Sequence, residues 1–314
     1  MTHYIFGPIN SRRFGNSLGI DLSPEQKRCN FDCLYCELAP KAAMKTSDAN
    51  FNVHEVISQL NTALALHDNI DVITLTANGE PTMYKDFALL VDELLSLPER
   101  KKLLVLSNSA HIGTPEVCQT LLKLDSVKLS LDAVSQDVFQ KIDRPHPSIS
   151  IENIKEGIRK FSRTFEGELL IEILFVEGIN DTPEEIRRLN DFLVSIDLTR
   201  IDIGTIDRPP AYGVKAVSNE KLQEIAMQFS KKLPINIVYR KEQAQQKSYY
   251  TPEEILLTLD KRPLTVDDIE ILFDETTMLH LQSLIKANKI VKVLENEQEF
   301  YILSKNLHKK RKNS

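Results

Sequence analysis

The sequence is poor in cysteine and has no long apolar run, and each shortage excludes a class of protein. Only four of its 314 residues are cysteine, and none is tryptophan. No run reaches the roughly 18 apolar residues that a membrane-spanning helix needs. Residues 1–8 also lack the basic start and apolar core of a secretion signal. The missing apolar run predicts no membrane contact. Because three of the cysteines are clustered, we also expect no disulfide framework and therefore a reducing cytoplasm.

A large excess of positive charge is also lacking. The net charge is −6, which argues against a protein that coats nucleic acid nonspecifically. With 42% hydrophobic and 27% charged residues, the composition is that of an ordinary globular protein. A chain of 314 residues has room for one large domain and a small one.

Three cysteines lie within eight residues, and their spacing is C-x3-C-x2-C: Cys29, Cys33 and Cys36. Thiolates this close select zinc, copper(I) or an iron–sulfur cluster. Structural zinc would need a fourth ligand, and none lies nearby. A [4Fe–4S] cluster on three thiolates instead keeps one iron open to an external ligand. Two alternatives stay open: the buried face of a helix, because the spacing is i, i+4, i+7, or half of a distant zinc site.

These cysteines, with aromatic Tyr35 directly before the last one, resemble the cluster motif of the radical S-adenosylmethionine (SAM) superfamily. The resemblance implies a [4Fe–4S] cluster on Cys29, Cys33 and Cys36, with SAM on the fourth iron and Tyr35 in the cofactor site. It implies an enzyme that reductively cleaves SAM to methionine and a 5′-deoxyadenosyl radical, which takes hydrogen from a substrate. The electron donor would be of the flavodoxin or ferredoxin type. The protein itself would supply placement and exclusion of water.

A second motif follows a predicted strand at residues 72–77. It reads Asn78-Gly79-Glu80-Pro81-Thr82. Glycine there lets the backbone approach a ligand, and proline fixes the turn. The motif resembles the one that binds the SAM amino group in the superfamily, with Asn78 in place of the usual first glycine. Glu80 could instead cap a predicted helix at residues 83–97.

Later strand ends supply further candidates. Asn108 follows the predicted strand 103–107, and Ser130 and Asp132 lie at the end of the strand 127–131. The resemblance implies that this last strand contacts the SAM ribose. For Asp132, turn and capping chemistry is the alternative.

Three other residues are interpreted from their local sequence. Arg12 and Arg13, in a breaker-rich segment (7–15) that reads as an irregular lead-in, are candidates for contact with an anionic substrate or SAM. A solvated pair is the alternative. Cys118 lies among apolar neighbours in a predicted helix and is expected in the core rather than at a metal.

Strands alternate with helices through the first 240 residues. This order indicates right-handed βαβ units and a parallel sheet, here an α/β open (β/α)6 partial TIM barrel, which the resemblance also implies. Each motif follows a strand's C-terminal end, where such barrels bind ligands. The six predicted strands are Leu18–Leu22, Val72–Ala77, Leu103–Ser107, Val127–Leu131, Leu169–Val176 and Ile201–Ile206.

The alternation stops after residue 240. We predict a barrel domain at 1–240, a polar linker at 241–248, a small winged helix-turn-helix domain at 249–304 and a basic tail at 305–314. Residues 249–304 contain eleven Asp and Glu against five Lys and Arg. Duplex DNA is therefore not an expected partner, since phosphate neutralisation provides most of such affinity.

Within the superfamily, the chain most resembles the branch related to tRNA 4-demethylwyosine synthase. Matching segments include Ser11-Arg12-Arg13, Arg144-Pro145-His146 and Gly178-Ile179-Asn180-Asp181, and they extend over residues 5–215. No cysteine precedes Cys29, so the second cluster of that enzyme has no counterpart and its reaction is not transferred. Three hypotheses follow: an enzyme acting on tRNA or other RNA, one acting on a peptide or protein docked on the winged helix, and a nonenzymatic iron–sulfur sensor. No catalytic side chain is assigned.

Overall fold

The computed structural model of the protein describes most of the chain. The described residues are 2–11, 14–46, 50–208, 210–238, 247, 249–261, 263–295 and 298–305. Arg12, Arg13, nearly all of the predicted linker and the basic tail beyond residue 305 lie outside them.

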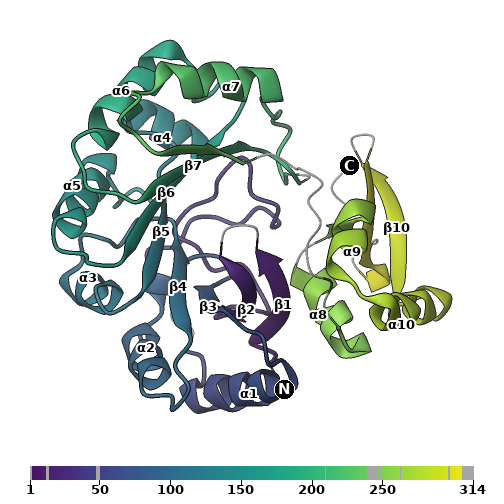
Figure 1. The fold of residues 1–314 in the computed structure, drawn as a ribbon. Coiled ribbons are helices and arrows are strands. Elements are labelled where there is room, and N and C mark those ends of the chain that lie inside the picture. The colour runs from purple at the N-terminus through teal and green to yellow at the C-terminus, as the bar shows by residue number, and fades with distance from the viewer. Residues whose placement is uncertain are drawn as a thin grey trace.

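Eight strands form one sheet, in the order of the chain (Figure 1). The first pairs antiparallel with the second, and every later pairing is parallel. The first and eighth strands are the two ends of the sheet, so it stays open. The strands are β1 (Ile5–Ser11), β2 (Gly15–Asp21), β3 (Val72–Thr76), β4 (Lys102–Ser107), β5 (Ser126–Ser130), β6 (Glu168–Phe175), β7 (Arg200–Thr205) and β8 (Ile235–Ile237).

Helices between the parallel strands cover the outer side of the sheet (Figure 1). This α/β arrangement with a mostly parallel sheet confirms the predicted class of fold. Helix α4 was not predicted, and the expected helix 83–97 is a short 3-10 turn, η1 (Pro81–Met83), followed by a separate helix. The helices are α1 (Val53–Leu66), α2 (Phe87–Leu95), α3 (Pro115–Leu121), α4 (Gln136–Ile142), α5 (Ile151–Ser162), α6 (Pro183–Leu193) and α7 (Asn219–Gln228).

The lead-in segment is a strand, so the expectation of an irregular start was wrong. β1 pairs with β2, and the register shifts between Phe6 and Ile9, on either side of Gly7-Pro8. Such an irregularity absorbs residues that would break a regular ladder. Proline has no N–H to donate to a neighbouring strand. It is tolerated in β1 because this is an edge strand, where some N–H groups have no neighbouring strand to bond to.

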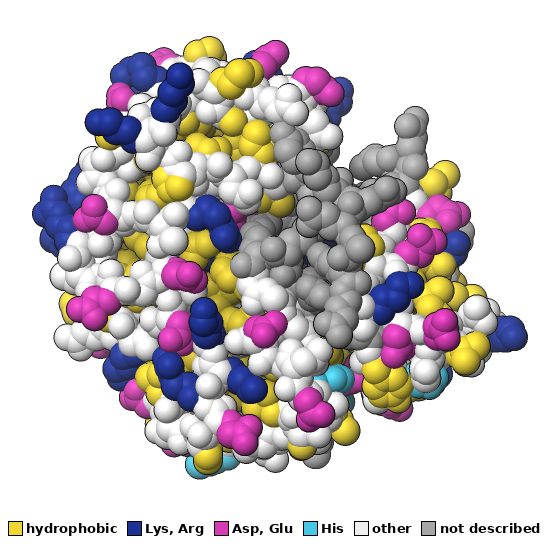
Figure 2. Space-filling view, in the orientation of Figure 1, with side chains coloured by type: hydrophobic (Ala, Val, Ile, Leu, Met, Phe, Trp, Pro, Cys, Tyr) yellow, Lys and Arg dark blue, Asp and Glu magenta, His cyan; other side chains and the backbone are white. Residues whose placement is uncertain are grey.

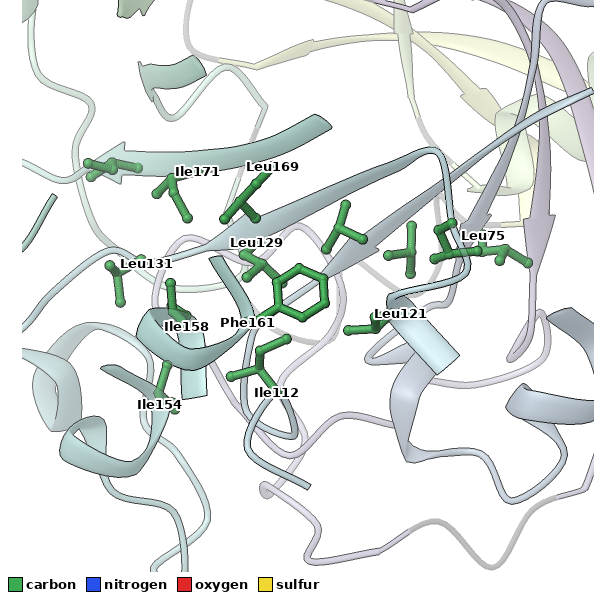
Figure 3. Close-up of a cluster of buried hydrophobic side chains, with 14 of the residues drawn as sticks. Leu75, Ile112, Leu121, Leu129, Leu131, Ile154, Ile158, Phe161, Leu169 and Ile171 are labelled. Atoms are coloured by element: carbon green, nitrogen blue, oxygen red, sulfur yellow. The ribbon is translucent and has the colours of Figure 1, made fainter. Parts of the chain in front are cut away.

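The main core lies between the sheet and the helices. Leu129 of β5 and Ile171 of β6 face Ile158 and Phe161 of α5, and all four are buried (Figure 3). Burial of one such side chain contributes about 1.5–3 kcal/mol. The packing therefore holds the strand ends, and the loops after them, in fixed positions.

The opposite face of the sheet carries charge. Lys128 of β5 alternates with core residues and points away from them. Its Nζ pairs with Glu172 of β6 and lies 3.4 Å from Asp202 Oδ2 of β7. Asp202 also accepts a hydrogen bond of 3.0 Å from Arg200 Nε. The inner surface near these strands is thus polar, and its positive and negative side chains pair with one another.

The surface is mixed in charge. On the face that Figure 2 shows, acidic and basic side chains lie interspersed over the helical layer. In the described part of the chain, no helix is both long and apolar enough to cross a membrane.

The C-terminal unit, residues 249–305, has its own hydrophobic core and a three-stranded antiparallel sheet. Three helices precede a β-hairpin, in the order that the sequence predicts. The assignment as a winged helix remains a prediction. Its elements are α8 (Pro252–Lys261), β9 (Leu264–Thr265), α9 (Val266–Leu272), α10 (Glu275–Lys286), β10 (Ile290–Glu295) and β11 (Gln298–Leu303).

The C-terminal unit packs on the edge of the large sheet, with α8 beside β1 (Figure 1). The hydroxyl of buried Tyr250 donates a hydrogen bond to the Pro8 carbonyl. His67 Nε2, just after α1, lies 2.8 Å from Glu254 Oε1 of α8. The unit thereby covers the edge strand, which would otherwise expose unpaired backbone groups.

Candidate active site

The three clustered cysteines lie in a loop directly after β2. No helix covers residues 29–36, so a buried helix face does not account for their spacing. All three are free thiols, and Cys118 lies apart from them on α3 against the main core, as expected. Burial raises the pKa of Cys29 to about 12, and it also raises the pKa values of Cys33 and Cys36.

This donor set suits a cluster better than a single ion. Among the residues that the structure describes, no three His, Cys, Asp or Glu side chains stand close enough together to hold one metal ion. A [4Fe–4S] cluster spreads its ligands over separate iron atoms and so accepts thiols that stand further apart. Iron would also supply the positive charge that these partly buried thiols need in order to ionise. The residues present therefore fit a three-thiolate cluster.

Asp32, between the first two cysteines, ties the cysteine loop together. Its carboxylate accepts hydrogen bonds from Lys27 Nζ at 3.0 Å, the Tyr212 hydroxyl at 2.5 Å and the Lys41 N–H at 3.3 Å. Arg144 Nη2 lies 3.2 Å away, and its guanidinium stacks 4.6 Å from the Tyr212 ring centre. Although burial alone would raise the pKa of Asp32, the hydrogen bonds from Tyr212 and Lys27 lower it.

Backbone hydrogen bonds fix the loop against the end of α4. The Asp32 N–H donates to the Asp143 carbonyl at 3.1 Å, and the Leu34 N–H donates to the Ile142 carbonyl at 2.9 Å. The His146 N–H donates to the Asn30 carbonyl at 2.9 Å. These bonds replace those of a regular element and hold the loop in one conformation.

Gly79, in the second motif, is where another loop meets the cysteine loop. It forms a parallel bridge with Arg28, and its φ is +147°. A Cβ at this position would lie 1.7 Å from the Arg28 carbonyl oxygen. The motif therefore needs glycine for a close backbone approach, as expected, although the partner is the protein's own backbone.

Glu80 has a fully buried side chain with four hydrogen-bond donors around it. Oε1 accepts from the Thr82 N–H at 3.0 Å, the Thr82 hydroxyl at 2.6 Å and the Ser107 hydroxyl at 2.8 Å. Oε2 accepts from the Asn108 N–H at 2.6 Å. Glu80 thus caps the short turn η1 rather than the predicted helix at 83–97, and it also joins the end of β3 to the end of β4.

Asn108 reaches the cysteine loop. Its Nδ2 donates to Asn30 Oδ1 at 2.6 Å and lies 3.5 Å from Cys29 Sγ. Asn30 Nδ2 in turn lies 3.2 Å from His111 Nε2. Asn30 and His111 were not predicted as site residues, because only their positions in space relate them to the cysteines. The position of Asn30 directly after Cys29 was the one available signal.

A second group of polar residues lies behind Cys33. The Tyr35 hydroxyl donates to Asp132 Oδ2 at 2.5 Å, and the Leu174 N–H donates to Oδ1 at 2.7 Å. Cys33 Sγ donates to Asp143 Oδ1 at 3.4 Å. Burial raises the pKa of Asp132 to about 6 and raises the pKa of Asp143 further, because two buried carboxyls here face each other.

Four predicted cofactor residues, one in the cysteine loop, one directly after β4 and two at or just after the end of β5, line a common cavity: Tyr35, Asn108, Ser130 and Asp132. It has room for about one water, about 10 Å³. A ligand of SAM's size needs a pocket of roughly 300 Å³ or more, so this cavity is an internal gap and not the cofactor pocket. Asn78 and Gly79 do not line it, and Glu80 connects to it through Asn108.

Comparisons with known proteins identify a family and similar relatives. The family model for the Radical SAM superfamily matches residues 26–193. The chain is 36% identical, over 299 residues, to the UPF0026 protein of Helicobacter pylori (strain J99), covering 95% of this chain and 96% of that protein.

Two solved structures share the fold. A radical SAM methyltransferase from Sphaerobacter thermophilus superposes with a TM-score of 0.55 at 16% identity, covering 71% of this chain and 66% of that one. SuiB from Streptococcus suis, bound to S-adenosylmethionine, superposes with a TM-score of 0.53 at 18% identity, covering 71% and 51%.

Proposed function

Because this chain belongs to the radical SAM superfamily, we propose that Cys29, Cys33 and Cys36 are the ligands of its cluster. The protein is an enzyme, and its cofactors are a [4Fe–4S] cluster and SAM. Membership therefore sets aside the nonenzymatic sensor. The observation that carries the assignment of ligands is the single loop after β2, which contains all three cysteines, whereas Cys118 lies on α3.

We propose that SAM lies beside this loop, at the C-terminal ends of β3, β4 and β5. Tyr35, Asn108, Ser130 and Asp132 support this placement, because they lie together beside the cysteine loop, around a gap that is itself too small for SAM. The backbone of Asn78 and Gly79 would form the neighbouring edge of the site. Glu80 would act by holding Asn108, since its carboxylate already accepts four hydrogen bonds within the protein.

The chemistry that the cofactors supply when bound is one-electron cleavage of SAM to methionine and a 5′-deoxyadenosyl radical. The protein's own residues hold the geometry for it. Asp32 and Asn108 fix the loop around the cysteines, and buried Asp132 with partly buried Tyr35 excludes water behind Cys33. A one-electron reductant is required, for which we propose a small flavodoxin or ferredoxin.

For the substrate we propose tRNA or another RNA. The resemblance to the branch related to tRNA 4-demethylwyosine synthase supports this choice. In Figure 2 the basic side chains are interspersed with acidic ones. Duplex DNA needs an extended basic surface, so this pattern favours an RNA that is contacted over a small area.

The second candidate substrate is a peptide or protein docked on the C-terminal unit. The excess of acidic residues between 249 and 304 favours it, since it would repel RNA phosphates and attract a basic peptide. Three helices followed by a hairpin support a winged helix there. In this proposal the barrel domain covers 1–240 and the docking domain 249–304.

An anaerobic assay tests the proposed function. Protein reconstituted with iron and sulfide should release 5′-deoxyadenosine from SAM on addition of dithionite. Release should increase with cell RNA if the substrate is RNA, and with peptide fractions if it is a peptide. Cys118→Ala serves as the matched control and should behave like the wild type. A wild-type protein that binds only zinc would refute the proposal.

A further inference from the structure

A short segment after β7 lies across the cysteine loop. This strap, residues 210–214, makes two direct contacts with it. The Ala211 N–H donates to the Cys36 carbonyl at 2.8 Å, and the Tyr212 hydroxyl donates to Asp32 Oδ2 at 2.5 Å. Just before the strap, Arg208 Nη1 pairs with both carboxylate oxygens of Glu37, at 2.8 and 3.0 Å. The strap therefore contacts the backbone of Cys36 and the side chain of Asp32.

The far end of the strap is anchored to the sheet. Ala216 forms a bridge with Val176, and the Val217 N–H donates to the Thr205 hydroxyl at 2.9 Å. Within the strap, Val214 at the anchored end packs against the main core, whereas Ala211 and Gly213 are exposed. A segment with exposed hydrogen bonds and little apolar burial opens locally while the rest stays folded. Opening would thus pivot at residues 215–217.

The strongest contact is the one between Tyr212 and Asp32. A hydrogen bond to a charged acceptor is worth more than a neutral one. The pair of Arg208 with Glu37 is partly exposed, at 26% and 30%, so solvent screens it. Since Asp32 lies between Cys29 and Cys33, the Tyr212 contact joins the strap to the segment that carries the proposed cluster ligands.

We propose that the strap is a latch over the cluster site, with Tyr212 and Asp32 as the positioning residues that close it. This inference rests on the proposed function, because it needs the cluster to bind Cys29, Cys33 and Cys36. The strap must open for the cluster to reach these thiols, which release their protons to solvent on binding iron. Once closed, it slows loss of the cluster.

Three variants test the latch. Tyr212→Phe removes only the hydroxyl that closes it. Gly213→Ala stiffens the strap, since an added Cβ meets nothing within 4 Å and the residue is not in the left-handed region. Tyr249→Phe changes an exposed tyrosine of the C-terminal unit and is the matched control.

Two rates are measured anaerobically by visible absorption. One is cluster uptake by apo-protein from iron and sulfide, and the other is loss of the cluster to a chelator. For Tyr212→Phe both should rise by about tenfold, the effect of losing one charged hydrogen bond. For Gly213→Ala uptake should slow by about two- to fivefold, from reduced chain freedom in the open state. In apo Tyr212→Phe, hydrogen exchange at the Ala211 amide should be faster.

Faster uptake is the decisive result, because a merely structural role of Tyr212 predicts faster loss with unchanged or slower uptake. The latch would be overturned if Tyr212→Phe showed faster cluster loss without faster uptake, or if neither rate changed. If the wild type loads its cluster at the same rate as Tyr212→Phe, the latch alone fails. If the wild type takes up no cluster, the proposed function fails and the latch fails with it.

Discussion

Replacing Glu80 by glutamine changes one atom of a fully buried side chain and tests what its carboxylate does. In the native protein Oε1 faces the Thr82 N–H at 3.0 Å, and Oε2 faces the Asn108 N–H at 2.6 Å. Both donors are backbone groups that cannot turn away. Glutamine offers one acceptor oxygen and one NH2 group, so in either orientation the NH2 opposes a backbone N–H.

The cost follows from that mismatch. A buried donor left without an acceptor costs about 1–3 kcal/mol. The hydroxyls of Thr82 and Ser107 can rotate to accommodate the new group, which limits the loss to one backbone donor. We therefore expect Glu80→Gln to lower the free energy of unfolding of the apo-protein by about 2 kcal/mol.

Urea unfolding of apo-protein, followed by circular dichroism, measures this loss. Glu166→Gln, at an exposed glutamate, is the matched control and should stay within about 0.5 kcal/mol of the wild type. SAM binding to the reconstituted variants is measured in parallel. If Glu80→Gln is as stable as the wild type yet loses SAM binding, the carboxylate contacts the cofactor directly and the reasoning is refuted.

Three further predictions follow from the site. Cys33→Ala should abolish cluster binding, measured as bound iron and sulfide, whereas Cys118→Ala should retain it; equal iron in both would contradict the ligand assignment. Gly79→Ala should yield little folded protein, because its Cβ would lie 1.7 Å from the Arg28 carbonyl oxygen; a soluble variant with native circular dichroism would count against this close approach. Burial raises the pKa of Asp132 to about 6, above its value of about 4 in an unfolded chain, so the contribution of this group to stability is greatest at low pH and is lost as pH rises through 6. Asp132→Asn should remove part of this decline in apo-protein unfolding measured between about pH 4 and pH 7, and identical slopes would refute it.

Local patterns were sufficient for the class of fold. The alternation of strands and helices is a property of short segments, so the sequence predicts the parallel strands that the structure contains. The same patterns failed at β1, where Gly7 and Pro8 suggest irregularity, because pairing with β2 outweighs local preference. They also missed α4, a helix of seven residues with too few periodic positions to detect.

For the site, local signals located residues but not their partners. That Tyr35, Asn108, Ser130 and Asp132 converge follows from parallel strands ending at one edge, and the structure places all four on one cavity. The motif at Gly79 and Glu80 differs, because its contacts are with Arg28, Ser107 and Asn108 rather than with open space. Local spacing cannot distinguish a carboxylate that caps its own turn from one that faces a ligand.

The sequence by itself determined the cysteine spacing, the order of strands and helices, and the polar residues after the strand ends, because each depends only on near neighbours along the chain. Tertiary structure alone decided that Tyr212 closes on Asp32 across 180 residues and that Tyr250 joins the C-terminal unit to β1. Such contacts depend on how distant elements pack, and packing is a property of the whole core. The spacing of the cysteines therefore indicates the kind of cofactor, and the fold determines which residues surround it.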